Sequence, residues 1–314
     1  MADDGPDASP APDDAFALLG NETRVEILRR LGEADGPLPF SELHERVAMR
    51  DSGQFNYHLE KLVGHFVTKD EAGYTLRHTG RRVVEAVLSG AVTDTPELER
   101  TPVDETCHRC GAPVEISWSE GSVRIYCTEC AGLYGLTRGR RPAIEAEHGY
   151  LGRLPLPPAG LRDRTPEAVL RAAWTWGNLE IYAMTHDICP RCSATVTTAV
   201  DVCDDHDARD GLCDACKSVY AARVTITCTN CIFEGGGVAA LALLGHTALL
   251  DFLTDHGHNP IAPESIHTLH EIHGDYDEEI LQTDPLRARF TFHADDDSLS
   301  LTVDETLVVV AVEH

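Results

Sequence analysis

The sequence predicts a multidomain α+β protein, and three observations lead to this prediction. Residues 13–92 alternate between segments of helical periodicity and one short pair of strand-like segments. Ten of the 11 cysteines form five C-x-x-C pairs between residues 107 and 231. Four apolar segments of alternating pattern then occupy the region after residue 278. A chain of 314 residues, 42% of them hydrophobic, is long enough for several separate cores.

The first residues predict neither a membrane anchor nor a secretion signal. Residues 1–12 are rich in proline, aspartate and small residues, which is typical of a disordered leader. They lack the basic and apolar regions of a signal peptide, and no apolar run in the chain approaches the roughly 20 residues of a membrane span. These features predict a cytoplasmic protein with no membrane partner.

Charge is distributed unevenly along the chain. The formal net charge is −26, which by itself argues against nucleic acid as a partner. Residues 15–90, however, hold 10 Lys and Arg against 11 Asp and Glu, so this region has a net charge of 10 − 11 = −1. Residues 15–90, which contain the first group of predicted helices, are therefore the least acidic part of the protein.

Three helices are predicted before residue 65. The first has apolar residues at the spacing of one helical face (Val25, Ile27, Leu28 and Leu31). Ser41 is expected to cap a short second helix that ends at Val47. A turn at residues 49–53 precedes the third helix, which begins at Gln54. Phe55, Leu59 and Leu62 are expected to face inward, which leaves Gln54, Asn56, Tyr57, His58 and Lys61 facing outward.

Two short strands and a closing helix complete this region. Residues 67–69 and 74–77 alternate like two strands around a turn at Glu71-Ala-Gly, and residues 78–88 form a further helical pattern. Helix, helix-turn-helix, two-stranded wing and helix is the order of a winged helix-turn-helix domain. The sequence thus predicts such a domain over residues 13–92.

Two segments carry a resemblance to a known family. Leu19-Gly-Asn-Glu-Thr-Arg-Val-Glu-Ile-Leu-Arg-Arg-Leu, followed by Phe55-Asn-Tyr-His-Leu-Glu-Lys-Leu, resembles the ArsR-type transcription regulators, especially their haloarchaeal branch. The acidic, lysine-poor composition is similar to that of proteins from salt-loving archaea. The resemblance implies a homodimer whose third helix enters the major groove of DNA while the wing flanks the backbone. Metal sensing is not carried over, because no cysteine precedes Cys107.

The chemistry of the third helix agrees with DNA recognition. Gln and Asn side chains pair bidentately with adenine, and Arg side chains near the wing can contact phosphates. The alternative is an ordinary polar surface helix, which the order of the elements disfavours. The predicted DNA-binding residues are Ser52, Gln54, Asn56, Tyr57, His58, Lys61, Arg77, Arg81 and Arg82.

The first cysteine group predicts a zinc ribbon over residues 107–135. Two strand-like segments separate Cys107-His-Arg-Cys110 from Cys127-Thr-Glu-Cys130. A hairpin with a C-x-x-C at each end brings four thiolates together, which is the ligand set of a closed structural zinc site. A redox role for one pair is the alternative, but no thioredoxin-like βαβ pattern surrounds it.

The second cysteine group predicts two further zinc sites over residues 189–234. If the strand-like segments 193–202 and 217–227 pair antiparallel, one site forms at the base of the hairpin and the other at its tip. Pairing of Cys189 and Cys192 with Cys213 and Cys216 remains an alternative, and a neighbouring aspartate could replace His206. The expected ligands are Cys189, Cys192, Cys228 and Cys231 at the base, and Cys203, His206, Cys213 and Cys216 at the tip.

The remaining segments predict connecting and C-terminal structure. Residues 93–106 are expected to be a linker, and residues 136–188 a connector whose helix begins at Thr165-Pro, with Trp174 and Trp176 in the core. Residues 235–314 predict a small α/β domain with a helix over 246–256 and antiparallel strands over 279–283, 286–293, 298–303 and 307–313. Gly235-Gly-Gly is no dinucleotide-binding motif, because it follows a zinc knuckle rather than a first β-strand.

Three histidines at three-residue steps could share one helical face in this last region. His267, His270 and His273 are interpreted as solvated surface residues, with a metal site or a pH sensor as the alternative.

Together these features predict a DNA-binding transcriptional regulator with structural zinc sites and a C-terminal sensing or dimerisation region. The alternative is an interaction factor, similar to archaeal transcription factor E, that contacts RNA polymerase and promoter DNA without a defined operator. An enzyme is not expected, because the chain contains no common catalytic motif and the cysteines occupy closed sites.

Overall fold

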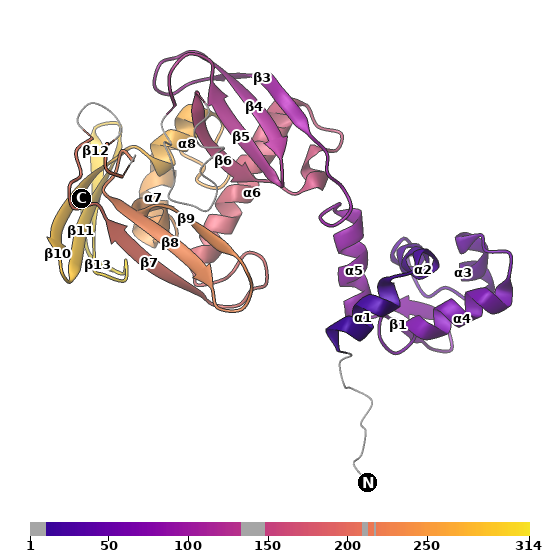
Figure 1. Ribbon diagram of the computed structural model, residues 1–314. Helices are drawn as coiled ribbons and strands as arrows, with labels where there is room; N and C mark the ends of the chain where they lie inside the picture. The colour runs from indigo at the N-terminus through magenta and orange to yellow at the C-terminus, as the bar shows by residue number, and fades with distance from the viewer. Residues whose placement is uncertain (1–10, 133–147, 209–212, 217) are drawn as a thin grey trace, which may run out of the picture. The chain divides into compact units, whose positions relative to one another are not determined.

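The computed structural model describes residues 11–132, 148–208, 213–216 and 218–314. Most of the predicted disordered leader, residues 1–10, lies outside the described residues. The chain divides into two compact units, Met1–Asp94 and Thr95–His314 (Figure 1). None of the described helices is long and apolar enough to cross a membrane.

The first unit contains five helices and a two-stranded sheet in its described residues. The elements are α1 (Pro12–Leu19), α2 (Glu22–Gly32), α3 (Phe40–Val47), α4 (Ser52–Leu62), β1 (Val67–Lys69), β2 (Tyr74–Leu76) and α5 (His78–Leu88). Apolar residues from α2, α3 and α4 form a core with Phe66, Val67 and Tyr74 of the hairpin region. The helical pattern of the sequence therefore identified the buried face of α2 correctly.

Gly73 fixes the approach of the β1–β2 hairpin to the helices. Its φ of +139° is unfavourable for a side chain, and a Cβ there would lie 2.5 Å from the carbonyl oxygen of Leu38. Leu38 in turn exchanges backbone hydrogen bonds with Tyr74. A glycine is needed because the backbones of the two segments are in direct contact.

Three local predictions in this unit need correction. Ser41 lies inside α3, which begins at Phe40 with Pro39 as the N-cap residue and no side-chain cap. The helix expected from Gln54 begins at Ser52, because Asp51 is its N-cap. His58 is buried with Phe55, Leu59 and Leu62, since the 3.6-residue period places residue 58 on the same face as residues 55 and 62.

The second unit begins with a four-stranded antiparallel sheet. Its strands are β3 (Leu98–Thr106), β4 (Pro113–Ser119), β5 (Ser122–Cys127) and β6 (Tyr150–Pro155), in that order. The linker expected over 93–106 is therefore a strand from Leu98 onward. Alternation explains why: Val103 pairs with Val114 and is buried, while its neighbours face solvent or are half-buried.

Two further antiparallel sheets follow in the second unit. One contains β7 (Val196–Val202), β8 (Ala222–Cys228) and β9 (Glu234–Val238); the other contains β10 (Tyr276–Thr283), β11 (Leu286–Ala294), β12 (Asp297–Val303) and β13 (Val309–Glu313). The C-terminal strand predictions are confirmed in type, order and approximate bounds. Gly235-Gly-Gly forms strand β9, in agreement with the rejection of a dinucleotide-binding loop.

Helices connect these sheets: η1 (Pro158–Leu161), α6 (Pro166–Met184), η2 (Ala239–Leu243), α7 (Thr247–Asp255) and α8 (Ile266–His273). Helix α6 begins as predicted, with the Thr165 side chain accepting from the Ala168 N–H. Trp174 is fully buried against the first sheet, whereas Trp176 is 41% exposed, so only the first of these tryptophans is a core residue.

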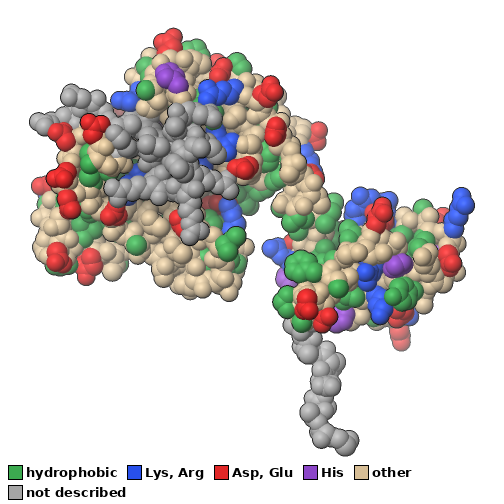
Figure 2. Space-filling model, viewed as in Figure 1, with side chains coloured by type: hydrophobic (Ala, Val, Ile, Leu, Met, Phe, Trp, Pro, Cys, Tyr) green, Lys and Arg blue, Asp and Glu red, His purple; other side chains and the backbone are tan. Residues whose placement is uncertain are grey.

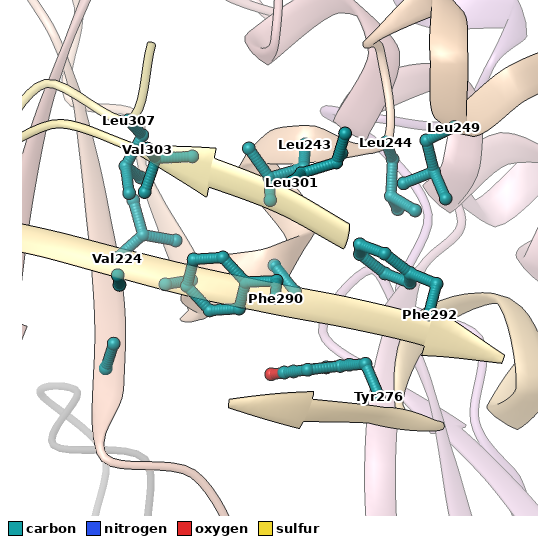
Figure 3. Close-up of a cluster of buried hydrophobic side chains, with 14 of the residues drawn as sticks. Val224, Leu243, Leu244, Leu249, Tyr276, Phe290, Phe292, Leu301, Val303 and Leu307 are labelled. Atoms are coloured by element: carbon teal, nitrogen blue, oxygen red, sulfur yellow. The ribbon is translucent and has the colours of Figure 1, made fainter. Parts of the chain in front are cut away.

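One core joins the second and third sheets. Side chains from β8, η2 and α7 pack with those of β11 and β12 in a single cluster (Figure 3). The expected boundary at residue 234 between a zinc module and a separate C-terminal domain is therefore wrong. The sequence pattern identifies the apolar face of each strand and helix, but it does not determine which of these faces pack against each other.

Acidic side chains are scattered over the visible surface of the second unit. Figure 2 shows Asp and Glu scattered over the visible face rather than gathered in one patch. This distribution follows from the composition, because residues 91–314 hold 36 Asp and Glu against 16 Lys and Arg. It gives a solvated surface rather than a specific anionic site.

Candidate metal centres and nucleic-acid interface

The first candidate metal centre lies at the base of the β4–β5 hairpin. Cys107, Cys110, Cys127 and Cys130 place their sulfurs within 4.8 Å of one another. The Sγ atoms of Cys107 and Cys130 are 3.8 Å apart, and those of Cys110 and Cys127 are 3.4 Å apart. Because Val114 pairs with Cys127, the hairpin register itself brings the two C-x-x-C turns together.

The second centre has the same construction at the base of the β7–β8 hairpin. Its ligands are Cys189, Cys192, Cys228 and Cys231, with sulfur separations of 3.7 Å between Cys189 and Cys231 and 3.5 Å between Cys192 and Cys228. Val196 pairs with Cys228, which is the equivalent register. The nested pairing of cysteines predicted from the two strand-like segments is confirmed.

The third centre lies beyond the other end of the β7–β8 hairpin. It combines Cys203, His206, Cys213 and Cys216, and His206 is thus the ligand that the geometry selects over the neighbouring aspartates. The His206 Nε2–H donates to the carbonyl oxygen of Val219 at 3.0 Å. This bond leaves Nδ1, 3.4 Å from the Sγ of Cys216, as the nitrogen that faces the sulfurs.

The geometry of the clusters fits a tetrahedral zinc ion. A zinc–sulfur bond of about 2.3 Å gives ligands about 3.8 Å apart in a regular tetrahedron. In each four-cysteine cluster two sulfur pairs are 3.4 to 3.8 Å apart, and the ligand atoms of each of the three clusters all lie within 4.8 Å of one another, close to this spacing. Backbone N–H groups also point at the sulfurs, as in the bonds from Glu129 and Cys130 to the Cys127 Sγ. The clusters can therefore hold a metal ion such as zinc.

Electrostatics within the clusters leads to the same conclusion. Backbone N–H donors from Cys231 and Asn230 lower the pKa of Cys228 to about 6. Burial, together with the neighbouring thiols, raises the pKa of Cys130 to about 12. Four adjacent thiolates repel one another, so full ionisation requires a cation between them. A bound zinc would supply that charge and close the site, which makes its role structural.

The first two centres belong to an internal structural repeat. Each module contains a C-x-x-C turn, a hairpin, a second C-x-x-C turn, a third antiparallel strand, a 3-10 helix and an α-helix, in that order. The first turns of the two modules have the same hydrogen bond. The Cys107 N–H donates to the carbonyl oxygen of Ala112 at 2.9 Å, and the Cys189 N–H donates to that of Ala194 at 2.8 Å. The second turns match as well, because the hydroxyl groups of Thr128 and Thr229 both donate to the strand opposite at 2.9 Å.

Helix α6 is tied to the second centre by an ion pair. The guanidinium of Arg191, which lies within the first C-x-x-C turn of that centre, donates through both terminal nitrogens to Glu180. The Glu180 side chain is only 8% exposed, while Arg191 is 44% exposed. Sequence reasoning missed this pair, because a buried glutamate inside an apolar helix has no local signature.

The predicted DNA-binding residues lie in two places in the first unit. Asp51 caps α4 by accepting from the N–H groups of Gly53 and Gln54. Ser52, Gln54, Asn56, Tyr57 and Lys61 of α4 are all exposed, whereas His58 is buried and cannot contact DNA from this position. Arg77, Arg81 and Arg82 are exposed at the start of α5 or just before it; Arg77 donates to Gly64, and Arg82 pairs with Glu85.

The three histidines of the C-terminal region do share a helix, α8, but they are not all solvated. His267 is exposed and bonds the Thr106 hydroxyl through Nε2 at 3.1 Å. His270 is half-buried and stacks on His108, with ring centroids 4.1 Å apart. The interpretation as surface residues is therefore wrong for His270 and His273, because α8 packs against β3 and the first C-x-x-C turn. The three do not converge as a metal site in the described residues.

Comparison with known families divides the chain in the same way as the structure. A family model described as a domain of unknown function, DUF7351, matches residues 104–309. The chain belongs to the DUF7351 family. A second model, DUF7347, also described as a domain of unknown function, matches residues 12–87. No protein of curated function and no solved structure matches the chain.

The two matches correspond to the two compact units. The DUF7351 region contains the three cysteine clusters and nearly all of the C-terminal sheet. The DUF7347 region ends at residue 87, seven residues before the end of the first unit at Asp94 (94 − 87 = 7).

Proposed function

We propose that this protein is a DNA-binding transcriptional regulator whose first unit is a winged helix-turn-helix domain. In this proposal α3 and α4 form the helix-turn-helix, β1 and β2 form the wing, and the second unit is a zinc-stabilised region for dimerisation or sensing. The proposal agrees with the expected homodimer and with double-stranded DNA as the partner.

The connection between α3 and α4 supports the proposed motif. Only residues 48–51 separate the two helices. Ala48 takes a left-handed conformation, with φ of 55°, and ends α3, while Asp51 caps α4. A turn of three or four residues between two packed helices is typical of helix-turn-helix motifs.

The exposed face of α4 is the observation that carries the proposal. Gln54, Asn56 and Lys61 are exposed on a helix whose opposite face is packed by Phe55, Leu59 and Leu62. Amide side chains on such a helix can pair with adenine N6 and N7 in the major groove. Lys61 adds a cation that lies 5.7 Å from the Tyr57 ring centroid.

The charge of the first unit is compatible with DNA binding at high ionic strength. Residues 15–90 of this unit have a net charge of only 10 − 11 = −1. Counterion release contributes little to affinity in concentrated salt, so this nearly neutral region loses little affinity there. Affinity would then depend on base contacts and shape rather than on a basic surface.

The test is genome-wide crosslinking and sequencing of DNA bound by the tagged protein in its native host. A parallel strain carries Gln54→Ala and Asn56→Ala, and a matched control strain carries Gln282→Ala, which removes an exposed amide from β10 of the second unit. We expect sharp sites that share a palindromic motif, lost in the double variant and retained in the control.

The opposite result would favour the interaction factor. Broad occupancy of active promoters that is insensitive to the α4 substitutions, together with co-purifying RNA polymerase, contradicts operator recognition. Purified variants with unchanged helical circular dichroism exclude unfolding as the cause of any lost binding.

A further inference from the structure

The third metal centre lies in an insertion relative to the internal repeat. Cys110 and Cys127 of the first module are 17 residues apart, whereas Cys192 and Cys228 of the second are 36 apart, a difference of 36 − 17 = 19 residues. The strand registers locate these extra residues. The second module continues by one further pair, Val202 with Ala222, and residues 203–221 then stand in place of the two-residue turn of the first module, so that the extra residues are 2 + 19 − 2 = 19.

The first module shows that the hairpin does not need this segment. It closes the equivalent position with the turn residues Glu120 and Gly121 between the paired Ser119 and Ser122. The cysteines at the hairpin base have the same pattern of burial in both modules. The first module thus has the base centre and the strand pairing without such a segment, and the third centre is an addition to this common pattern.

The segment itself has little apolar material with which to fold. It contains five aspartates but only one lysine and one arginine. Two backbone hydrogen bonds in its described residues are made by candidate ligands: the Cys203 N–H donates to the carbonyl oxygen of Ala221, and the Cys213 N–H to that of Ser218, each at 3.0 Å. Since such a segment buries few apolar side chains, metal coordination is the interaction that can order it.

The C-terminal end of the segment contacts the C-terminal sheet. The Glu278 carboxylate on β10 accepts from the N–H groups of Ala221 and Ala222, each at 2.8 Å. The Tyr220 ring stacks on Tyr276 with centroids 4.0 Å apart and planes 13° apart, and its hydroxyl donates to the carbonyl oxygen of Gly274. Burial raises the pKa of the half-buried Glu278 despite its two N–H partners.

The ligands and β10 face one cleft. A cavity of about 550 Å³ is lined by Cys203 and His206 on one side and by Tyr276 and Glu278 on the other. His206 is linked to the contact directly, because the carbonyl that accepts from its Nε2 belongs to Val219, the residue before Tyr220.

We propose that the third centre is a metal-dependent clamp that holds residues 218–222 against β10 and the end of α8. A thiophilic divalent cation such as zinc binds Cys203, His206, Cys213 and Cys216 and fixes Tyr220 and the backbone at residues 221 and 222. Release of this ion frees the contact while the two four-cysteine centres keep both modules folded. The inference does not depend on DNA binding.

Removal of the three ions should therefore occur in two stages. Loss of the third ion requires only local unfolding of residues 203–221, whereas loss of either other ion opens the base of a module. We expect graded addition of a chelator to the zinc-loaded full-length protein to give a populated form with two ions, counted by native mass spectrometry. Simultaneous loss of all three ions would overturn the proposal.

Hydrogen exchange on the two-ion form tests the clamp itself. Backbone amides of residues 218–222 and 276–280 should lose protection, while amides of β4, β5 and the bases of β7 and β8 keep theirs. Unchanged protection at residues 276–280 would contradict the clamp even if the third ion leaves first.

Three variants separate metal binding from the contact. His206→Ala should bind two zinc ions and lose protection at both segments. Tyr220→Ala should keep three ions but lose protection at residues 276–280. In the third variant, residues 202–222 are replaced by Glu-Gly, the turn of the first module; it should bind two ions and retain a cooperative thermal transition. Failure of this last variant to fold, with His206→Ala also failing, would show that the third centre is required for the fold and would contradict the clamp.

Discussion

At the scale of the residue, burial decides what the histidines of this protein can do. The Nε2 atom of His273 is fully buried, and burial lowers the pKa of His273 to about 4. Burial and the neighbouring His270 likewise lower the pKa of His108 to about 4. Such groups are neutral in the folded protein but take up protons when unfolded, so they make the fold sensitive to acid.

We therefore expect His273→Phe to reduce the acid sensitivity of the protein. Because the folded pKa of His273 lies below its unfolded value of 6.5, the unfolded state binds more protons between these values, and stability falls as the pH drops from 6.5 to about 4. In the variant, the number of protons taken up on unfolding between these pH values should be smaller by about one. Its unfolding free energy should therefore change less steeply with pH. Urea midpoints of wild type and variant between pH 4.5 and 7.5 measure this, with metal loss common to both proteins. Parallel pH profiles would contradict the buried, neutral state.

At the scale of the element, capping and registers place the functional side chains. Asp51 determines where α4 begins and thereby which side chains form its exposed face. The registers Val114 with Cys127 and Val196 with Cys228 bring the two cysteine turns of each module together. The cap thus positions the exposed side chains of α4, and each register positions the cysteines of its own module.

We expect Asp51→Ala to lower the stability of the first unit by about 1 kcal/mol, because two N–H groups at the start of α4 lose their acceptor. Asp51→Ser should restore most of this loss, since a serine hydroxyl can accept the same bonds. Thermal unfolding followed by circular dichroism measures both changes. Equal stability of the alanine and serine variants would exclude a capping role.

At the scale of the whole molecule, the protein combines one unit without cysteine and one that contains the three cysteine clusters. Because the three cysteine clusters lie in the unit Thr95–His314, we expect metal binding to stabilise that unit. That unit also carries most of the charge: residues 95–314 hold 16 Lys and Arg against 35 Asp and Glu, a net charge of 16 − 35 = −19. The two units should therefore respond differently to chelators and to salt.

Calorimetry with a strong chelator should separate the two units. We expect two unfolding transitions for the metal-loaded protein, of which the chelator abolishes or lowers only one, because metal binding contributes directly to the folding free energy of its domain. The remaining transition should match the unfolding of the helices in the first unit. A chelator that shifts both transitions equally would contradict the independence of the units.

Salt should raise the unfolding temperature of the second unit more than that of the first. Residues 1–94 have a net charge of 10 − 17 = −7, against −19 for the rest, so repulsion between like charges is greater in the second unit. Raising ionic strength from 0.1 to 1 M shortens the screening length from about 10 to about 3 Å and weakens this repulsion. Scans with sodium chloride measure the effect; an equal shift of both transitions would argue against charge as the cause.

The sequence by itself determined the features that depend on local spacing. The C-x-x-C pairs, the strand-like segments between them and the order of the helices in the first unit all follow from residues close together in the chain. The ligand sets of the three metal clusters could be predicted because a hairpin has only a few ways to bring its ends together.

Tertiary structure alone decided which faces are covered. His58 lies on the inner face of α4, and His270 stacks on a cysteine turn 162 residues earlier in the chain (270 − 108 = 162). Strands β8, β11 and β12 contribute side chains to one core. The contact between the inserted segment and β10 joins Ala221 to Glu278 across 57 residues. A periodic sequence pattern indicates that one face of a helix or strand is apolar. Which element packs against that face depends on segments distant in the chain. This packing also determines how deeply each side chain is buried, what it contacts and how its pKa is shifted.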